Sequence, residues 1–562
     1  SVFGETWDRT RLASGVFRYG NLPDPSSRTM VYYHDGRTAT VAVGKGTVNK
    51  SLFISTNGKP DASLDTAWVR YDTLAPRRYL GGDISTQVLL PLITMAHAPR
   101  GKVAAVIGEG SGMTSHLLLG SPYLTSVTTV EIEPGMIEGS KQFRPANSRV
   151  FDDPRSHIVI ADAKTFFATQ TGTFDMVVSE PSNPWVSGVS GLFTQEFYAR
   201  VRRYLSPDGV FGQWLHLYEI DDALVLSVIE AIHRNFPSYE IYMTSNGDIL
   251  IVASNKSTLP TPDWSVFDYP MIAKDLRPSM RFTPRSLDAA YVGGRAMFDP
   301  MFADRAGANS DFYPRLDLGS EKARFIHANA DGIANLNFDD FDYVSALQRR
   351  RIPFDTETIA PVPSIPRQRA LTEGAVLRKR RVATAEDTAS GTDIGTMLAR
   401  RARFEDAMAS GRAPADWHAW MTDALQVSRD LHGGTAGVVD EHFYTEVSKY
   451  LAAQHAPAVT RQVFTFQRAL WSYDFVAASA LADTLGPDVA AGSTWYPADD
   501  LRDGGAIAKL ALGDVDGARK YWVLLQPRTK RRPDSVRSLL IGAYIIAADR
   551  ARKAHGSTQP AR

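Results

Sequence analysis

The sequence predicts an α/β fold in which a Rossmann-like sheet follows a small β domain and precedes an all-α region. Three observations support this prediction. A short apolar run at 103–107, rich in β-branched residues, ends in a glycine-rich loop, as a buried parallel strand does. Further short apolar runs follow it at intervals. From about residue 396 to the end, the hydrophobic pattern has the period of helices.

Residues 1–100 are expected to form a β-rich domain and a lead-in helix. Apolar and polar residues alternate over 31–43, and Asp35-Gly36 is a hairpin turn signal within that stretch. The run 51–55 and the following Asn57-Gly58 repeat the pattern. A helix over 74–95 would then lead into the central sheet.

Residues 101–260 are expected to form the Rossmann-like, nucleoside-binding domain. The strand at 103–107 is followed by a loop with alternating glycines, Gly108, Gly110 and Gly112. Glycine allows a tight turn and brings backbone N–H groups close to a ligand. A helix over 113–119 and a strand over 127–133 come next, and Glu131 lies near the end of that strand. Nucleoside-binding sites of α/β proteins are typically built from a strand, a glycine loop, a helix and a second strand that carries an acid.

The glycine spacing narrows the class of nucleoside. A dinucleotide-binding loop has glycine at its sixth position, where this chain has Met113, and no Gly-Lys-Ser/Thr phosphate loop is present. The G-x-G-x-G spacing suits a ligand without a pyrophosphate, and the Glu131 carboxylate could accept hydrogen bonds from both ribose hydroxyls. The alternative is a glycine-rich turn in an unrelated α/β protein.

Acidic residues follow two further predicted strands. Asp162 closes the apolar run 158–161, and Glu180 follows the run 174–179. Another strand is expected over 209–217. Ligands of open α/β sheets bind at the carboxyl ends of the strands, so Asp162 and Glu180 are candidate site residues. No His, Asp and Glu cluster has the spacing of a metal site, and no metal is expected.

At this point the chain resembles a known family. Residues from roughly 41 to 256 resemble the spermidine synthase (polyamine aminopropyltransferase) family, which has the Rossmann-like fold of class I S-adenosylmethionine-dependent methyltransferases. The resemblance rests on ordered stretches: LFISTNGKPDAS, STQVLLPLITMAH, VAAVIGEGSG, TVEIE, IADAKTFF, FDMVVSEPSNP, LFTQEFYARVRRYLSPDGV and GQWLHL. The motif SEPSNPW resembles in particular a bacterial branch in which such a domain follows a polytopic membrane segment.

The resemblance implies roles for individual residues. The loop Gly108, Gly110, Ser111 and Gly112 would bind the nucleoside co-substrate, with Glu131 on the ribose and Asp162 on the adenine. Glu180 would stand where the family has its catalytic aspartate. The substrate-binding residues would be Gln87, Asn183 and Trp185. Three positions depart from the family pattern, because Ser111, Glu180 and Asn183 stand where the family has aspartates.

The expected function is that of a spermidine synthase-like transferase. It would move an aminopropyl group from decarboxylated S-adenosylmethionine to a small-molecule amine acceptor in polyamine biosynthesis. One alternative is a methyltransferase, or another enzyme that uses intact S-adenosylmethionine. The other is a catalytically silent nucleoside-binding scaffold for the helical region.

The rest of the chain is expected to divide into three parts. Residues 261–350 would be an extension that completes the active site, and 351–395 a proline-rich and basic linker. Residues 396–562 would form a helical domain, in which LALGDVDGARKYWVLL resembles a tetratricopeptide hairpin. Such a helical tail could bind a protein partner.

Composition limits the class of protein. Lys+Arg and Asp+Glu both number 62, which argues against a nucleic-acid-binding protein. The chain has no cysteine, so disulfides and thiolate chemistry are excluded. No apolar run reaches the ~20 residues of a membrane span. The expected location is cytoplasmic. Resemblance to the membrane-fused branch adds the expectation of a tether to the inner membrane through a segment absent from this chain, and a homo-oligomer remains open.

Overall fold

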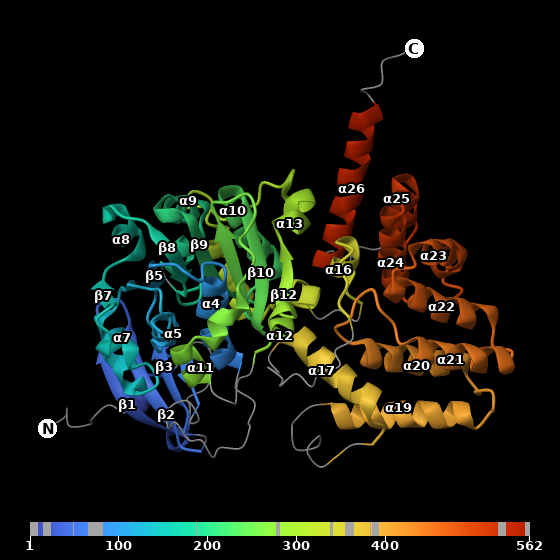
Figure 1. Cartoon of the computed structure of the whole chain (residues 1–562), viewed down its shortest axis with the longest axis horizontal. Helices are drawn as coiled ribbons and strands as arrows, with labels where there is room; N and C mark the ends of the chain where they lie inside the picture. Colours follow the sequence, from blue (N-terminus) through green and yellow to red (C-terminus); the bar gives the residue numbers. More distant parts are fainter. Residues whose placement is uncertain are drawn as a thin grey trace. The chain divides into compact units, whose positions relative to one another are not determined.

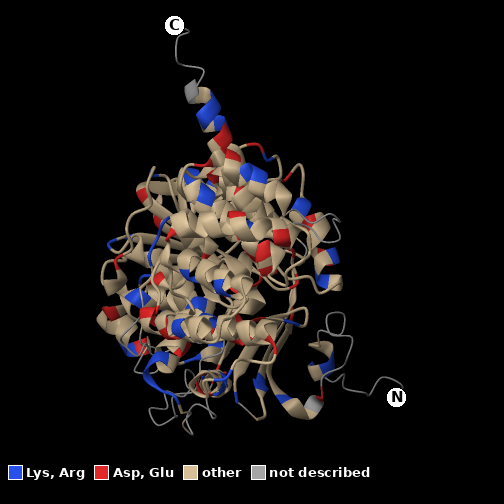
Figure 2. Ribbon diagram, turned by 90° about the vertical axis from the view of Figure 1, so that its right-hand side faces the viewer, with Lys and Arg blue, Asp and Glu red and all other residues tan. Residues whose placement is uncertain are grey.

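The computed structural model describes residues 9–14, 24–48, 50–65, 82–186, 188–276, 282–337, 341–353, 365–382, 384, 393–525 and 535–556. The chain divides into two compact units (Figure 1). The first comprises Ser1–Arg295, Ala306–Asp331 and Val362–Ile365, and the second comprises Ala296–Arg305, Gly332–Pro361 and Pro366–Arg562. Basic and acidic residues are interspersed along the ribbon (Figure 2), as the equal numbers of the two kinds lead one to expect.

The N-terminal sheet is antiparallel, with its strands in chain order β1-β2-β3-β4. Its strands are β1 (Arg28–Asp35), β2 (Thr40–Gly46), β3 (Leu52–Thr56) and β4 (Lys59–Leu64). Both predicted hairpin turns are present, and Asn57 and Gly58 have the positive φ angles that a tight turn needs. The short segments α1 (Arg9–Leu12) and η1 (Pro25–Ser27) precede this sheet.

The central sheet has eight strands in the order β12-β10-β11-β9-β8-β5-β6-β7. The strands β9, β8, β5, β6 and β7 are parallel, and β11 lies antiparallel between β9 and β10. Their bounds are β5 (Val103–Ile107), β6 (Ser126–Glu131), β7 (Ser156–Ile160), β8 (Phe174–Ser179), β9 (Leu205–His216), β10 (Ser238–Ser245), β11 (Asp248–Ser254) and β12 (Tyr291–Gly294). This arrangement confirms the predicted Rossmann-like fold.

Helices cover the central sheet and bury its middle strands. Every residue of β11 is buried, as are the last eight of β9, because helices such as α4 pack against these strands. The helices of the first unit are α4 (Gly82–Ala96), α5 (Met113–Leu118), α6 (Pro134–Ser140), α7 (Arg149–Asp152), α8 (Ala163–Thr169), α9 (Gln195–Tyr204), α10 (Asp222–Asn235), α11 (Pro270–Leu276), α12 (Pro284–Asp288) and α14 (Arg315–Phe325), with 3₁₀ segments η2 (Lys141–Phe143), η3 (Val189–Phe193) and η4 (Trp264–Asp268).

Several predicted elements differ in detail from the structure. Helix α4 begins at Gly82, and the earlier part of the helix predicted over 74–95 lies outside the described residues. Strand β6 ends at Glu131, two residues before the predicted end. Strand β12 was not predicted, because Tyr-Val-Gly-Gly is short and half glycine, and it forms only by pairing with β10.

The second unit is helical, as predicted for the C-terminal region. Its segments are α13 (Arg295–Phe302), α15 (Asp331–Ala334), η5 (Asn335–Asn337), α16 (Tyr343–Leu347), α17 (Pro366–Lys379), α19 (Ile394–Ala409), α20 (Trp417–His432), α21 (Glu441–Ala453), α22 (Ala458–Ser472), α23 (Phe475–Ala490), α24 (Ala498–Ala511), α25 (Val515–Leu524) and α26 (Val536–Gly556). The helices from α22 to α25 each pack on the next one along the chain. The tetratricopeptide-like repeat itself stays a prediction.

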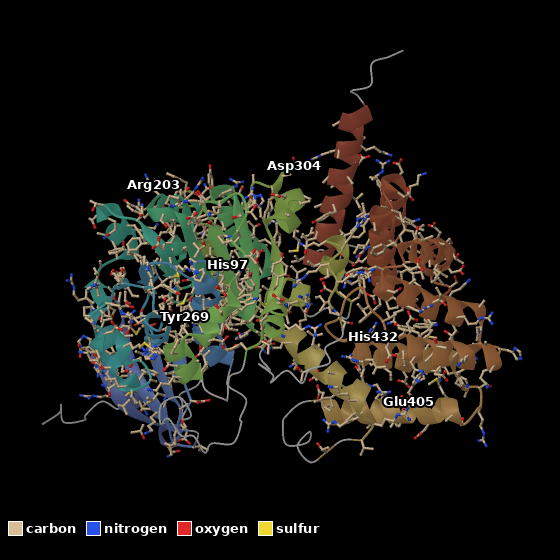
Figure 3. All side chains as sticks on the ribbon, in the orientation of Figure 1. His97, Arg203, Tyr269, Asp304, Glu405 and His432 are labelled. Carbon is tan, nitrogen blue, oxygen red and sulfur yellow. The ribbon has the colours of Figure 1, made fainter. Side chains whose placement is uncertain are left out.

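Buried hydrogen bonds join neighbouring helices of this unit. His432, labelled in Figure 3, bonds through Nδ1 to the Ser428 carbonyl at 2.6 Å and accepts at Nε2 from the Asp440 N–H at 2.8 Å, which joins α20 to α21. Burial lowers the pKa of His432 to about 4, so the ring is neutral at pH 7. Within the predicted linker 351–395, residues 366–379 form helix α17, which packs on α19 and α20.

Candidate functional site

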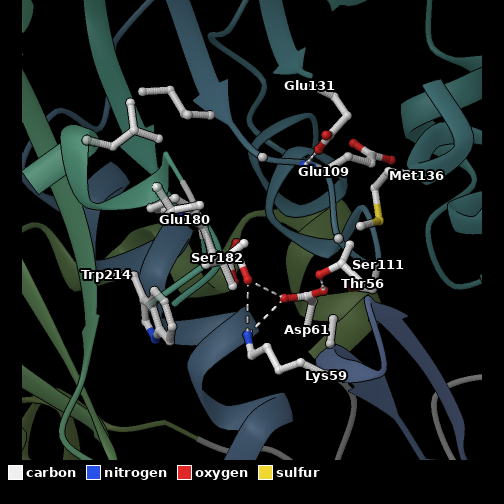
Figure 4. Close-up of a pocket in the computed structure, with 18 of the residues that line it drawn as sticks. Thr56, Lys59, Asp61, Glu109, Ser111, Glu131, Met136, Glu180, Ser182 and Trp214 are labelled. Carbon is white, nitrogen blue, oxygen red and sulfur yellow. Dashed lines mark hydrogen bonds and ion pairs between the residues drawn. The ribbon is translucent and has the colours of Figure 1, made fainter. Parts of the chain in front are cut away.

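A cavity of about 640 Å³ opens at the carboxyl ends of β5, β6, β7 and β8. The glycine loop, the residues that follow β7 and β8, strand β4 of the N-terminal sheet and the start of β11 supply its walls. Figure 4 shows Lys59 of β4, Ser111 of the loop and Glu180 around the cavity. All of these elements belong to the first unit. The cavity therefore lies at the edge of the sheet where the sequence predicted a ligand, and where parallel α/β sheets bind ligands.

The glycine loop needs its glycines. Gly108, Gly110 and Gly112 have φ angles of +92°, +53° and +81°, which side chains rarely tolerate. A Cβ on Gly108 would lie 2.5 Å from the carbonyl oxygen of Glu180, and one on Gly112 would lie 2.8 Å from Glu109 Oε1. The loop is thus a close-fitting cradle, and the predicted residues Gly108, Gly110 and Ser111 line the cavity, whereas Gly112 does not.

Glu131 is buried at the end of β6, in the position predicted for a ribose ligand. Its Oε2 accepts from the N–H of Glu109 at 3.0 Å, and its Oε1 accepts from the N–H of Glu133 at 2.9 Å. Burial raises the pKa of Glu131, although these backbone hydrogen bonds oppose the rise. The carboxylate is therefore held in one orientation with acceptor capacity left over.

Asp162 also lines the cavity, and it begins helix α8. Its Oδ1 accepts from the N–H of Thr165 at 2.9 Å, which is a side-chain N-cap. The cap uses one carboxylate oxygen and fixes the side chain. The other oxygen can still accept a hydrogen bond from a ligand amine.

The two remaining loop residues point in different directions. Ser111 donates to Gln87 Oε1 at 2.5 Å, whereas Glu109 accepts from the hydroxyl of Ser140 at 2.8 Å. Gln87 in turn donates to the carbonyl of Ser63 at 2.9 Å. Burial raises the pKa of Glu109 to about 8, so this carboxyl is protonated at pH 7. Glu109 thus does not replace the charge that Ser111 lacks beside Gln87.

Glu180, the predicted catalytic residue, follows β8 and faces the cavity. The hydroxyl of Thr114, on the first turn of α5, donates to Glu180 Oε2. Burial raises the pKa of Glu180 to about 7, and the neighbouring Asp83 and Asp248 carboxylates add to the rise. A carboxyl group with such a pKa can exchange a proton near neutral pH, as a general base must.

Asp83 and Asp248 are cavity residues that the sequence reasoning missed. Asp83 accepts from the hydroxyl of Ser63 at 2.6 Å, and burial raises its pKa to about 6. Asp248 accepts from the hydroxyls of Thr86 and Ser245 at 3.0 and 2.7 Å and from the indole N–H of Trp214 at 3.1 Å. Asp83 could have been found from its spacing to the predicted residue Gln87, because residues four apart lie on the same face of a helix.

Lys59, Asp61 and Ser182 form a second group that was missed, shown by dashed lines in Figure 4. Lys59 Nζ lies 2.8 Å from Asp61 Oδ1 and 3.3 Å from Ser182 Oγ, and Ser182 donates to Asp61 Oδ1 at 2.7 Å. The side chains of Lys59 and Asp61 are only 9% and 10% exposed. The group ties β4 to the loop after Glu180, and only the fold brings these residues together.

Two predicted substrate-binding residues do not line the cavity. Asn183 is fully buried, with its amide nitrogen 3.5 Å from the hydroxyl of Tyr218. Trp185 packs edge-on against His216. Trp214 is the tryptophan of the cavity wall instead. The turn after Ser182 directs both side chains away from the cavity, so neither enters the function proposed below.

The predicted extension 261–350 does not reach the cavity either, among the described residues. Asp311 pairs with Lys164, and the amide of Asn309 donates to the carbonyl of Phe193. This segment therefore packs behind η3, whose Val189 and Leu192 line the cavity. It supports the wall from outside.

Comparison with known proteins gives the family. Residues 85–246 match the family model of the spermine/spermidine synthase domain. This chain contains a spermine/spermidine synthase domain. The match covers the end of the N-terminal region and most of the central sheet, and it includes the glycine loop, Glu131, Asp162 and Glu180. The match agrees with the predicted family over this region, and the membrane-fused branch stays a prediction.

Curated relatives of this synthase domain are similar over the same region. A spermidine synthase of Dictyostelium discoideum is 30% identical over 168 residues, which are 28% of this chain and 58% of the relative. A polyamine aminopropyltransferase of Caldicellulosiruptor saccharolyticus is 30% identical over 27% of this chain and 54% of the relative. One of Shigella boydii is 35% identical over 22% and 41%. The chain thus spans about half the length of the curated relatives it matches.

Solved structures give the same kind of match at lower similarity. The spermidine synthase of Thermotoga maritima is 20% identical, with a TM-score of 0.36 over 47% of this chain and 84% of that one. A spermidine synthase solved in complex with the transition-state analogue AdoDATO is 19% identical, with the same TM-score and coverage.

Two further features concern the described part of the chain. No group of three or more His, Asp and Glu side chains there could bind a metal ion. None of the helices described is both long and apolar enough to cross a membrane.

Proposed function

We propose that this chain transfers an aminopropyl group from decarboxylated S-adenosylmethionine to a small amine acceptor. The match to the spermine/spermidine synthase domain supports this proposal, since it includes the glycine loop, Glu131, Asp162 and Glu180 of the cavity wall. The single observation that carries it is the position of Glu180. A carboxyl group with a pKa of about 7 lies at the end of β8, beside the cradle of a nucleoside.

The nucleoside part of the donor would occupy the cradle. Glu131 would accept hydrogen bonds from the ribose hydroxyls and Asp162 one from the adenine amino group, as the resemblance implies. The left-handed glycines bring the loop backbone close enough to contact the donor. Because Glu131 and Asp162 are each fixed by backbone N–H groups, little side-chain freedom would be lost on binding.

The charge of the cavity favours cationic substrates. Among its described lining residues are eight carboxyl groups and one basic side chain, Lys59; the acids are Asp61, Asp83, Glu109, Glu131, Glu133, Asp162, Glu180 and Asp248. Both a sulfonium donor and an amine acceptor are cations, so such a cavity raises their local concentration. Asp83 and Asp248 also restore negative charge that Asn183 does not supply.

The reaction would be a one-step displacement. A neutral amine nitrogen attacks the carbon of the aminopropyl group that is attached to sulfur, a C–N bond forms, and the C–S bond breaks. Its electron pair leaves with the thioether nucleoside, and the amine proton passes to Glu180. Glu180 would also orient the amine, while Thr114 fixes the carboxylate. Much of the rate would come from alignment of the nitrogen and the carbon.

The test is product analysis with decarboxylated and with intact S-adenosylmethionine, each with 1,4-diaminobutane as acceptor. Aminopropyl transfer yields methylthioadenosine, whereas methyl transfer yields S-adenosylhomocysteine. We expect methylthioadenosine from the decarboxylated donor, at a kcat/KM that rises with pH through about 7 as Glu180 ionises. Glu180→Gln should abolish turnover and leave nucleoside affinity within about twofold.

Glu138→Gln is the matched control, because Glu138 is 56% exposed and lies outside the cavity. Formation of S-adenosylhomocysteine would favour the methyltransferase alternative, and nucleoside binding without any product would favour the scaffold. A Glu180→Gln variant with most of the wild-type rate would exclude Glu180 as the base. The membrane tether, the homo-oligomer and a partner of the helical region remain separate predictions.

A further inference from the structure

A buried ammonium group is unexpected in a cavity for cationic substrates, and Lys59 is such a group. Its side chain is 9% exposed, and it is the one basic side chain among the described lining residues. Its charge is paired with Asp61 at 2.8 Å, and seven further carboxyl groups line the cavity. A second cation of the substrate would be repelled from its immediate surroundings.

The hydrogen bonds of Lys59 leave room for a ligand. An ammonium group has three N–H donors, and Asp61 and Ser182 account for two of them. Asp61 is fixed in turn by the hydroxyls of Thr56 and Ser182. Nζ is thus held in place, and it points from β4 toward the loop after Glu180 (Figure 4).

Lys59 also acts on two further carboxylates of the cavity, Asp83 and Asp248. Its charge lowers the pKa values of Asp83 and Asp248, against the larger effect of their burial. The cavity therefore presents one ammonium and two carboxylates within electrostatic reach of one another. That pattern is the complement of a zwitterion, with Lys59 for a carboxylate and Asp83 and Asp248 for an ammonium group.

We infer that Lys59 is a specificity residue that binds the carboxylate of an amino-acid group, so that one of the two substrates carries a carboxylate. The inference rests on the proposed function, since it assigns this part of the same cavity. The carboxylate could belong to the donor, as in intact S-adenosylmethionine, or to a diamino-acid acceptor. In both cases the C–S bond breaks and the C–N bond forms as above, and the carboxylate takes no part in the chemistry.

The experiment uses two pairs of ligands, and the members of each pair differ by one carboxylate. Intact and decarboxylated S-adenosylmethionine form the donor pair. The acceptor pair is 2,5-diaminopentanoate and 1,4-diaminobutane, measured with methylthioadenosine in the nucleoside site. Calorimetry on the full chain gives one dissociation constant for each of the four ligands. It is carried out on the wild type, on Lys59→Gln and on the double variant Lys59→Gln/Asp61→Asn. The double variant leaves no unpaired buried charge, so it separates recognition from a folding defect.

We expect the wild type to bind the carboxylate-bearing member of one pair at least as tightly as the other member. Lys59→Gln and the double variant should weaken that member roughly ten- to hundredfold, which is the value of a hydrogen bond to a charged group. The dissociation constant of the member without the carboxylate should change by no more than about twofold. The pair that responds identifies the substrate. Lys45→Gln, which changes a lysine of β2 outside the cavity, should change none of the four constants.

Rejection of both carboxylate-bearing ligands by the wild type would overturn the inference, as would ratios that no Lys59 variant changes. If methylthioadenosine still forms from decarboxylated S-adenosylmethionine and 1,4-diaminobutane in that case, the proposed function stands and only the role of Lys59 falls. If no nucleoside ligand binds at all, both fall together.

Discussion

Replacing Glu180 by glutamine should make the first unit more stable at pH 8, although it removes the proposed base. The folded protein raises the pKa of this carboxyl group from 4.5 to about 7, mainly because it is buried. At about 1.4 kcal/mol per pH unit, this shift makes ionised Glu180 cost roughly 3 kcal/mol of folding free energy. Glutamine keeps the shape and the acceptor for Thr114 and has no charge to bury.

The sign of the pH dependence follows from the raised pKa. Below pH 4.5 the carboxyl is protonated in the folded and the unfolded chain, so it has no effect on relative stability. As pH rises from 4.5 to 7 the unfolded chain loses the proton first, and the wild type loses stability relative to Glu180→Gln. Above pH 7 the difference is constant. For a unit of about 300 residues, roughly 3 kcal/mol corresponds to a rise in Tm of roughly 5 °C.

The assay is thermal unfolding of both proteins between pH 4.5 and 8. The transition that methylthioadenosine raises belongs to the unit that contains the cavity. Glu138→Gln serves as the control, since an exposed carboxylate in a surface pair contributes about 0–1 kcal/mol. A Glu180→Gln variant with the Tm of the wild type at pH 8, or a Tm difference that does not vary with pH, would refute the reasoning.

Three further predictions concern the nucleoside site, the donor and the domain boundary. Glu131→Gln and Asp162→Asn should each weaken nucleoside binding by about 1–3 kcal/mol in calorimetry, and unchanged affinity in both would remove the site assignment. Ser111→Asp should shift preference toward the decarboxylated donor, by about tenfold for each 1.4 kcal/mol of added charge interaction. The measurement is the ratio of the dissociation constants of the two donors. A wild type that already rejects the intact donor strongly would contradict this prediction. A chain that ends at Asp331 keeps the first unit except Val362–Ile365, and it should stay folded and bind the nucleoside. An insoluble product, or one that binds no nucleoside, would show that the helical unit is needed.

Much of the fold could be predicted because its signals are local. The bounds of β5 and β8 agree with the apolar runs 103–107 and 174–179, since strands buried on both faces read as continuous apolar stretches. The stretch 461–485 has a continuous helical pattern in the sequence, but it is not a single helix. It is α22 and α23, separated by Tyr473 at a φ of +61°, a conformation that a non-glycine residue rarely adopts and that its sequence does not signal.

The half of the cavity to which we assign the nucleoside could also be located from sequence. The glycine loop, Glu131, Asp162 and Glu180 each end or follow a strand of one parallel sheet. Carboxyl ends of parallel strands meet at the same edge, so their order along the chain is enough to place them together. Asn183 and Trp185 follow the same strand, yet the turn after Ser182 carries them out of the cavity. In an irregular loop, no periodic pattern in the sequence predicts the direction in which a side chain points.

The sequence by itself thus determined the class of fold, the glycine cradle and the acids at the strand ends, because backbone geometry and hydrophobic period are properties of short segments. Only the tertiary structure decided the other half of the cavity. Lys59 comes from β4 of the separate N-terminal sheet, Asp83 from the start of α4 and Asp248 from β11. They meet because the N-terminal sheet packs over the loop and because the β10–β11 hairpin enters the sheet beside β9. Such convergence depends on the packing of elements far apart in the chain, and so does the burial that raises the pKa of Glu180.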